Sequence, residues 1–229
     1  MVKVAIVFSS GHGHTRTIAT HILAGASAVD GVRAELHEIV PAHIGPDGRW
    51  HDQTIIDALD EADAIVFGAP TYMGSAHGLF KLFLEYGFSP WLGQSWKDKV
   101  AAGFTNSASR AGDKLIALEQ MAVFAAQMAM IWVGVGDQPG GNHVASKYTD
   151  VNVNGSWLGL SAQSFGDGTP ETAPHPGDRL TAERFGRRIA RTTARWMMGN
   201  AAYPAQRVSE EESRRRNIAG MDEWQRFDD

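Results

Sequence analysis

The sequence contains no cysteine in its 229 residues. This absence excludes disulfide bonds, catalytic thiolates, zinc-thiolate sites and cysteine-ligated iron–sulfur clusters. Because side-chain thiols are missing, any redox chemistry of this chain must come from a bound cofactor.

Long apolar runs and a strong excess of charge are also missing. No apolar stretch approaches the roughly 20 residues that span a bilayer, and residues 1–8 resemble a strand without the basic start of a signal peptide. We therefore expect a cytoplasmic protein with no membrane span. The formal net charge of −5 gives no general attraction for nucleic acid, so no nucleic-acid partner is expected.

The remaining composition, with 43% apolar and 21% charged residues, is that of a folded globular protein. Up to residue 136, short β-rich apolar runs alternate with helix-period segments, which is typical of βαβ units. The sequence thus predicts an α/β fold, a doubly wound five-stranded parallel sheet with helices on both faces. We predict strands at residues 2–8, 32–39, 64–68, 100–105 and 130–135, and helices at about 15–29, 53–62, 75–86, 113–128 and 180–198.

Two later segments depart from this rhythm. Residues 137–177 are rich in Gly, Asn, Ser and Pro and exceed a usual connection in length. They predict a functional loop or a split of the fifth strand, with a short extra strand at 157–161. The arginines of the last helix lie away from its apolar residues, which indicates a solvated face. We predict one domain at 1–198 and a charged tail at 199–229 that is disordered or binds a partner.

The segment after the first predicted strand is the most informative. A helix follows it directly, and a helix start at the carboxyl edge of a parallel sheet offers unpaired N–H groups to an anion. Glycines there let a phosphate approach the backbone, and hydroxyl groups add donors. The sequence therefore predicts a site for a terminal phosphate ester, as in a mononucleotide. The segment consists of Ser10, Gly11, His12, Gly13, His14 and Thr15.

Other interpretations of this loop fit less well. A Walker A loop needs a lysine and a spacing that are absent, and the dinucleotide fingerprint G-x-G-x-x-G fails at Arg16, although Glu38 lies near the end of the second strand. His12 and His14 form a candidate metal pair without cysteine or evident carboxylate partners, so no metal is expected. A plain turn and helix cap stays open as an alternative.

Two further polar loops follow the third and fourth predicted strands, at residues 68–75 and 105–112. All three loops leave the same carboxyl edge, so together they describe a site large enough for a flat heteroaromatic ring. A phosphoacceptor receiver domain is excluded, because it needs aspartates where Ser9-Ser10 and Ala69-Pro70 stand. The absence of a G-x-S-x-G elbow excludes the usual α/β-hydrolase.

With these loops in this order, the chain resembles the WrbA family of flavodoxin-like NAD(P)H:quinone oxidoreductases. The similarity covers about residues 2–198 and lies in SSGHGHTRTIA, FGAPTYMGS, residues 79–85, Trp91 and NGSWLG. It implies a flavodoxin-like fold, FMN as cofactor, NADH or NADPH as reductant and a homo-oligomer, either dimer or tetramer. It also implies ping-pong transfer of two electrons from NAD(P)H to a quinone or a similar small acceptor.

The resemblance also implies roles for individual residues. Residues 10–15 would hold the FMN phosphate, and His12 would border the nicotinamide nucleotide. Trp91 would wall the acceptor pocket, where Gln127 replaces the histidine usual in the family. The flavin itself would carry the chemistry, without a catalytic side chain. Its ring would lie along Pro70, Thr71, Tyr72, Met73 and Gly74, with its pyrimidine side on Ser107, Ala108, Ser109, Arg110 and Ala111.

Three other functions stay open at this stage. One is a one-electron flavodoxin carrier, and another is an FMN-dependent reductase of nitro, azo, flavin or iron-chelate acceptors. The third is a flavodoxin-like interaction protein that uses its charged tail. The chain length, the mild net charge and the long loop favour the enzyme over the carrier, because such carriers are usually smaller and strongly acidic.

Overall fold

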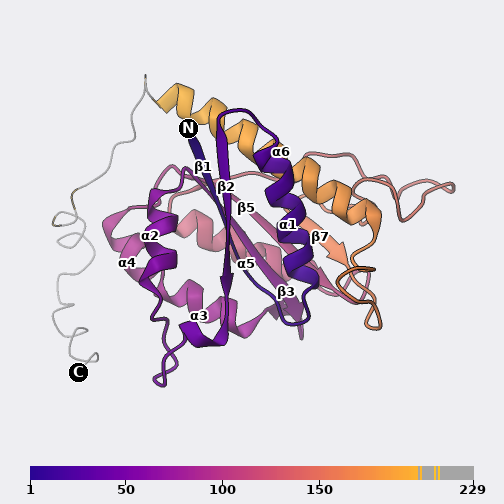
Figure 1. Ribbon diagram of the computed structural model, residues 1–229, viewed down its shortest axis with the longest axis horizontal. Coiled ribbons are helices and arrows are strands. Elements are labelled where there is room, and N and C mark those ends of the chain that lie inside the picture. The colour runs from indigo at the N-terminus through magenta and orange to yellow at the C-terminus, as the bar shows by residue number, and fades with distance from the viewer. Residues whose placement is uncertain (201, 203–208, 210, 212–229) are drawn as a thin grey trace.

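The computed structural model describes residues 1–200, 202, 209 and 211, so most of the predicted tail lies outside the described residues. A parallel sheet with the order β2-β1-β3-β5-β6 forms its centre (Figure 1). The predicted five-stranded parallel sheet is confirmed. Its strands are β1 (Val2–Ser9), β2 (Val32–Ile39), β3 (Ala64–Tyr72), β5 (Val100–Ser107) and β6 (Ile131–Trp132).

Helices cover both faces of this sheet, which explains why β1, β3 and β5 are almost wholly buried. On one face, α1 (His14–Ser27) and α6 (Pro176–Asn200) lie side by side (Figure 1). Their residues Ile18 and Phe185 pack on the sheet with Ile6. The other face carries α2 (Gln53–Glu61), α3 (Gly78–Tyr86), α4 (Phe88–Gly93) and α5 (Lys114–Gln127), after a 3-10 turn, η1 (Pro41–His43).

The fifth strand position is split, as the sequence predicts. β6 pairs with the first residues of β5, and β7 (Leu160–Gln163) pairs in parallel with the last ones, from Phe104 to Ser107. The extra strand was expected at 157–161 and lies two to three residues later. The long loop therefore leaves the sheet after β6 and returns to its carboxyl edge, beside the predicted site.

The segment after the third strand differs from the prediction. β3 continues beyond residue 68 to Tyr72, and a tight turn at Met73 and Gly74 joins it to β4 (Ser75–Ala76), which pairs with it antiparallel. α3 consequently begins at Gly78 and not at residue 75. Proline lacks a backbone N–H group. β3 nevertheless tolerates Pro70, because its pairing with β1 ends at Gly68 and no hydrogen bond between these two strands is lost.

No helix among residues 1–200 combines the length and the apolar character that a bilayer crossing requires.

Candidate functional site

The first loop, residues 10–13, connects β1 to α1 and takes its shape from one side chain. Ser10 Oγ accepts hydrogen bonds from the backbone N–H groups of Gly13 at 3.1 Å and Arg16 at 3.3 Å. Gly13 has a φ of 87°, in the left-handed region that favours glycine. Ser10 thus performs the turn-capping role, while its hydroxyl hydrogen stays available for an anion. The amides of His14 and Thr15, which have no intrahelical partner at the start of α1, stay available as well.

The long loop covers the start of α1. His14 Nε2 lies 2.9 Å from the carbonyl oxygen of Gly168, and Thr17 Oγ1 donates to the carbonyl oxygen of Pro170 at 3.3 Å. Arg179 fixes this covering segment by donating to the carbonyl oxygens of Pro174 and Glu171, both at 2.7 Å. The ring of His14 is therefore engaged by the loop, so that His14 can offer an anion its backbone N–H.

Tyr72 brings the second loop onto the first. Its ring packs edge-on against His77, with 5.3 Å between centroids, and its hydroxyl lies so close to Gly11 that a Cβ there would overlap it. His77 Nδ1 in turn lies 3.1 Å from Ser9 Oγ at the end of β1. Burial lowers the pKa of His77, which favours its neutral form. Sequence reasoning did not include His77 in the site.

The remaining residues of the second loop divide between the interior and the surface. Pro70 and Thr71 are buried, and Thr71 Oγ1 lies 2.7 Å from Thr105 Oγ1. Met73 is fully exposed with a φ of 47°, and Gly74 has a φ of 77°. An exposed apolar side chain on a strained turn at the site offers a surface against which a flat ring can pack.

The third loop, residues 108–113, follows β5. Ala108, Ser109, Arg110 and Ala111 are exposed, while Ser107 is half-buried and donates to the carbonyl oxygen of Ser109 at 3.1 Å. The Arg110 guanidinium lies 5.1 Å from the ring centroid of Tyr148, a residue of the long loop. This cation–π contact links the third loop to the same loop that covers the first.

A buried lysine holds the third loop from beneath. Lys114 is only 2% exposed, and its Nζ donates to the carbonyl oxygens of Ala162 at 2.9 Å and Ser109 at 3.1 Å. Gln163 Nε2 adds a bond of 3.0 Å to the carbonyl oxygen of Ala108. Burial lowers the pKa of Lys114 to about 8. The returning strand β7 and the third loop are thereby joined.

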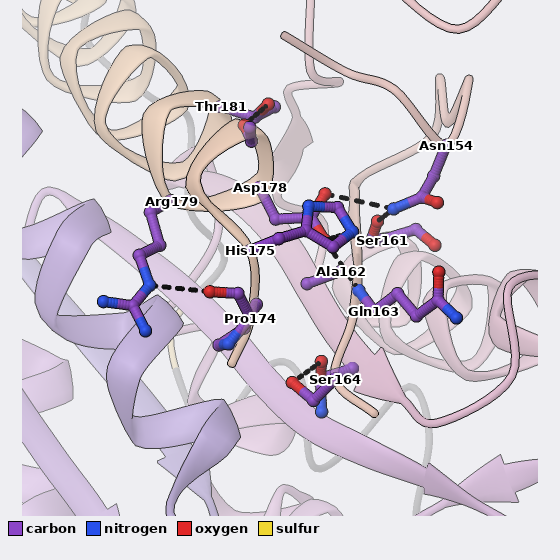
Figure 2. A network of polar contacts seen from close by, with 12 residues as sticks. Asn154, Ser161, Ala162, Gln163, Ser164, Pro174, His175, Asp178, Arg179 and Thr181 are labelled. Carbon is purple, nitrogen blue, oxygen red and sulfur yellow. Dashed lines mark hydrogen bonds and ion pairs between the residues drawn. The ribbon is translucent and has the colours of Figure 1, made fainter. Parts of the chain in front are cut away.

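Asp178, at the start of α6, is the centre of the adjoining network (Figure 2). Its carboxylate accepts from the backbone N–H of Gln163 at 2.7 Å and from Asn154 Nδ2 at 3.0 Å. His175 points toward it, with Nε2 3.5 Å from Asp178 Oδ2, and neither ring nitrogen of this buried histidine has a hydrogen-bond partner among the described residues. Burial raises the pKa of Asp178 to about 7 and lowers that of His175.

Replacing Asp178 by asparagine is expected to change how stability depends on pH. The folded protein binds a proton at Asp178 up to about pH 7, whereas the unfolded chain releases it near pH 3.8, so this contribution to stability is full below the lower value and lost as the pH rises to the upper one. The free energy of unfolding of the wild type, relative to Asp178→Asn, should fall by ~2 kcal/mol between about pH 5 and 7. Urea denaturation at both pH values measures it, and a constant difference would contradict the raised pKa.

The remaining predicted substrate residues lie elsewhere. Trp91 and Gln127 line one groove of about 730 Å³ between α3, α4 and α5, together with apolar residues such as Phe88 and Val123. Of the residues that line this groove, none belongs to the three loops. His12 is exposed on the first loop. Within the described chain, the structure thus brings Trp91 and Gln127 together without joining them to His12.

The residues of the three loops fit FMN. The helix start, the Ser10 hydroxyl and the glycine backbone suit a phosphate monoester. Gly11 leaves room beside Tyr72, and the exposed Met73 and third loop offer a platform and backbone groups for a planar ring. These features come from segments more than 30 residues apart that meet at one sheet edge.

Comparison with known proteins gives consistent matches. A family model described as NADPH-dependent FMN reductase matches residues 2–138. Flavodoxin FldP of Pseudomonas aeruginosa is 39% identical over 83% of this chain and 96% of its own length. An NAD(P)H dehydrogenase (quinone) of Geobacter sulfurreducens is 30% identical over 85% of this chain and 98% of its own. The crystal structure of a WrbA-like flavodoxin from Agrobacterium tumefaciens superimposes with a TM-score of 0.62 at 33% identity, covering 85% of this chain and 99% of that one.

Proposed function

Because the chain belongs to the NADPH-dependent FMN reductase family, we propose that it transfers two electrons from NAD(P)H to a quinone. It is an FMN-dependent oxidoreductase of flavodoxin-like fold. The observation that carries the proposal is the meeting of three loops at the carboxyl edge of the sheet, where Tyr72 lies against Gly11 and Lys114 holds the third loop. When bound, FMN supplies the chemistry, since it accepts a hydride and gives up electrons.

The chain's own residues bind and orient. In the proposed site, the amides of residues 11, 12, 14 and 15 and the Ser10 hydroxyl would hold the phosphate, and the dipole of α1 would add to this attraction. The segment from Pro70 to Gly74 would lie along the ring, and the exposed side chain of Met73 would offer it an apolar surface. Residues 107–111 would present backbone groups to the pyrimidine side of the ring and stabilise negative charge there. His12, exposed on the phosphate loop, would border the nicotinamide nucleotide.

A change at Gly13 is expected to weaken FMN binding. Alanine there would keep a φ of 87° and place a Cβ 2.7 Å from Pro170 Cγ, so either the loop or its cover must move. We expect Gly13→Ala to bind FMN at least about tenfold more weakly, a loss of about one hydrogen bond to a charged group. The matched control is Gly48→Ala, because Gly48 has a φ of 78°, no atom near its would-be Cβ and lies outside the three loops. Fluorescence titration of the apoprotein measures both, and equal affinities would contradict the placement of the phosphate.

The proposed acceptor pocket involves Trp91 and Gln127, and the proposed assembly is a homodimer or homotetramer. Support for an assembly comes from large exposed apolar side chains on α4 and α5, three of which, Phe88, Ile116 and Val123, line the groove of Trp91 and Gln127. Phe88, Leu115, Ile116 and Val123 are between 45% and 67% exposed. Light scattering of the FMN-loaded protein tests the assembly, and a monomer would oppose it.

The absorption spectrum of the purified protein tests the proposed activity. Bound FMN should give a yellow protein. NADH or NADPH should bleach the colour, and a quinone should restore it. Initial rates at several fixed quinone concentrations should give parallel double-reciprocal lines, whereas intersecting lines would refute a ping-pong sequence. Assays with nitro, azo, flavin and iron-chelate acceptors identify the preferred substrate class.

A flavodoxin-type carrier is the second candidate, because a flavodoxin is among the relatives that match most of the chain. Redox titration separates the two functions. A two-electron enzyme passes from oxidised to reduced flavin with little radical, whereas accumulation of a large radical fraction would favour the carrier. Failure to bind FMN at all would exclude both candidates and leave an interaction protein.

A further inference from the structure

Five arginines of α6 line a single groove at the outer edge of the sheet. The groove has a volume of about 290 Å³ and is closed on one side by residues 135–137, which follow β6. Within the described chain, no residue of the three site loops takes part in its lining. The arginines recur at intervals of three and four positions, so they share one side of the helix. They are Arg184, Arg187, Arg188, Arg191 and Arg195.

Two of these arginines are fixed in place by the wall of the groove. Arg184 donates to both carboxylate oxygens of Asp137, at distances between 2.6 and 3.1 Å, and Arg188 Nε donates to the carbonyl oxygen of Gly134 at 3.0 Å. Gly136 has a φ of 80°, and a Cβ there would lie 2.6 Å from Arg188 Cζ. The guanidinium of Arg188 thus lies so close to the backbone of the wall that only glycine leaves room for it at position 136.

The other three guanidinium groups have no such partner. Within the described residues, no ion pair or hydrogen bond neutralises Arg187, Arg191 or Arg195, and Asp137 is the one carboxylate among the lining residues. Like charges four residues apart destabilise a helix. A bound anion would remove this repulsion. The arginine pattern, which in the sequence alone indicates a solvated face, therefore favours an anion site in this groove.

We propose that the groove binds a di- or triphosphate group. Guanidinium groups recognise phosphate oxygens in a planar, bidentate manner that lysine does not offer. Successive unpartnered arginines are one turn apart, a rise of about 6 Å, so a single phosphate reaches few of them and a chain of phosphates reaches more. The volume is near the lower limit of small-molecule sites, which suits such a group better than a peptide strand.

Isothermal titration of the full-length, FMN-loaded protein tests this proposal with tripolyphosphate, ATP, inorganic phosphate and a glutamate-rich peptide. Saturable binding of tripolyphosphate, at least tenfold tighter than inorganic phosphate, is expected. If ATP bound as tightly as tripolyphosphate, the phosphate group could belong to a nucleotide. If ATP bound much more weakly, the ligand would be a free polyphosphate anion. No saturable binding, or tighter binding of the peptide, would overturn the proposal.

Single substitutions distinguish a specific binding site from a general effect of positive charge. Arg191→Gln should weaken tripolyphosphate binding at least tenfold without a change in melting temperature, because Arg191 makes no bond to the described protein. Arg33→Gln, which removes the same charge from β2 at the opposite edge, should change it less than twofold. Equal losses in both would overturn the proposal.

The alternative occupant to be tested is the acidic sequence Glu210, Glu211 and Glu212 of the same chain. Glutamine at Glu210, Glu211 and Glu212 together should leave the affinity unchanged within twofold. A tenfold gain would mean that these residues occupy the groove, and the proposal of a phosphate site would then be wrong.

Discussion

Methionine in place of Lys114 is expected to lower the free energy of unfolding by about 3 kcal/mol. The substitution keeps an apolar stem of similar length but removes the two hydrogen bonds that Nζ donates to Ser109 and Ala162. It also removes the positive charge that favours the ionised form of the nearby Asp178. Because the third loop loses its support, the variant should also bind FMN at least about tenfold more weakly, which corresponds to a loss of ~1.4 kcal/mol.

Urea denaturation and fluorescence titration measure these two effects. Lys81→Met is the matched control, because Lys81 is exposed on α3 and its ion pair among the described residues is with Glu85, one turn away. Such exposed pairs contribute about 0.3–0.5 kcal/mol. If the two variants were equally stable, the proposed role of Lys114 in holding the third loop would be wrong.

Alanine at Gly186 is expected to lower the free energy of unfolding by about 3 kcal/mol or more. At this position α6 crosses α1 so closely that a Cβ would overlap the carbonyl oxygen of Ile22. A Cβ at Gly25 of α1 would likewise overlap the carbonyl oxygen of Glu183 in α6. A backbone carbonyl in a helix cannot move aside as a side chain can. The helices must therefore separate, which opens the packing of Phe185 and Ile189 on the sheet.

Gly199→Ala provides the control within the same helix. Its Cβ would meet no atom of the described residues within 4 Å, and alanine has the higher helix propensity, so the change should be neutral or slightly stabilising. Thermal or urea denaturation of both variants tests the close contact. Equal stabilities would contradict the interlocking of α1 and α6.

The elements that sequence predicts well are those with strong periodicity and clear ends. β2 and α2 begin at the predicted residues because apolar alternation and helix period are undisturbed there. The third strand was predicted too short, since Pro70 and the following hydroxyl and glycine residues have the composition of a loop. Tertiary pairing with β5 overrides that local preference as far as Asn106.

Short elements without periodicity were missed or placed a few residues away. α4 has six residues and contains a proline, so neither its length nor its pattern marks a helix. β7 pairs with β5 for four residues only, and its position depends on where the long loop returns. Loop composition predicted that a return exists, but not its register.

The part of the site that lies within one loop was predictable from the sequence. The part that depends on residues far apart in the chain was not. The glycine and hydroxyl pattern of residues 10–15 indicates an anion site locally. By contrast, Asp178 looks like an ordinary acidic residue in the first turn of a helix, and Lys114 like a surface lysine. Their burial follows only from the return of β7 to the carboxyl edge, a contact between segments about 50 residues apart.

The affinity of the apoprotein for FMN, compared with riboflavin, tests the central claim most directly. The two ligands share the ring and differ in the phosphate that we place at the start of α1. Several charge-assisted hydrogen bonds at that position predict that FMN binds at least about 100-fold more tightly. Equal affinities for the two ligands would contradict the account, because the phosphate would then not contribute to binding.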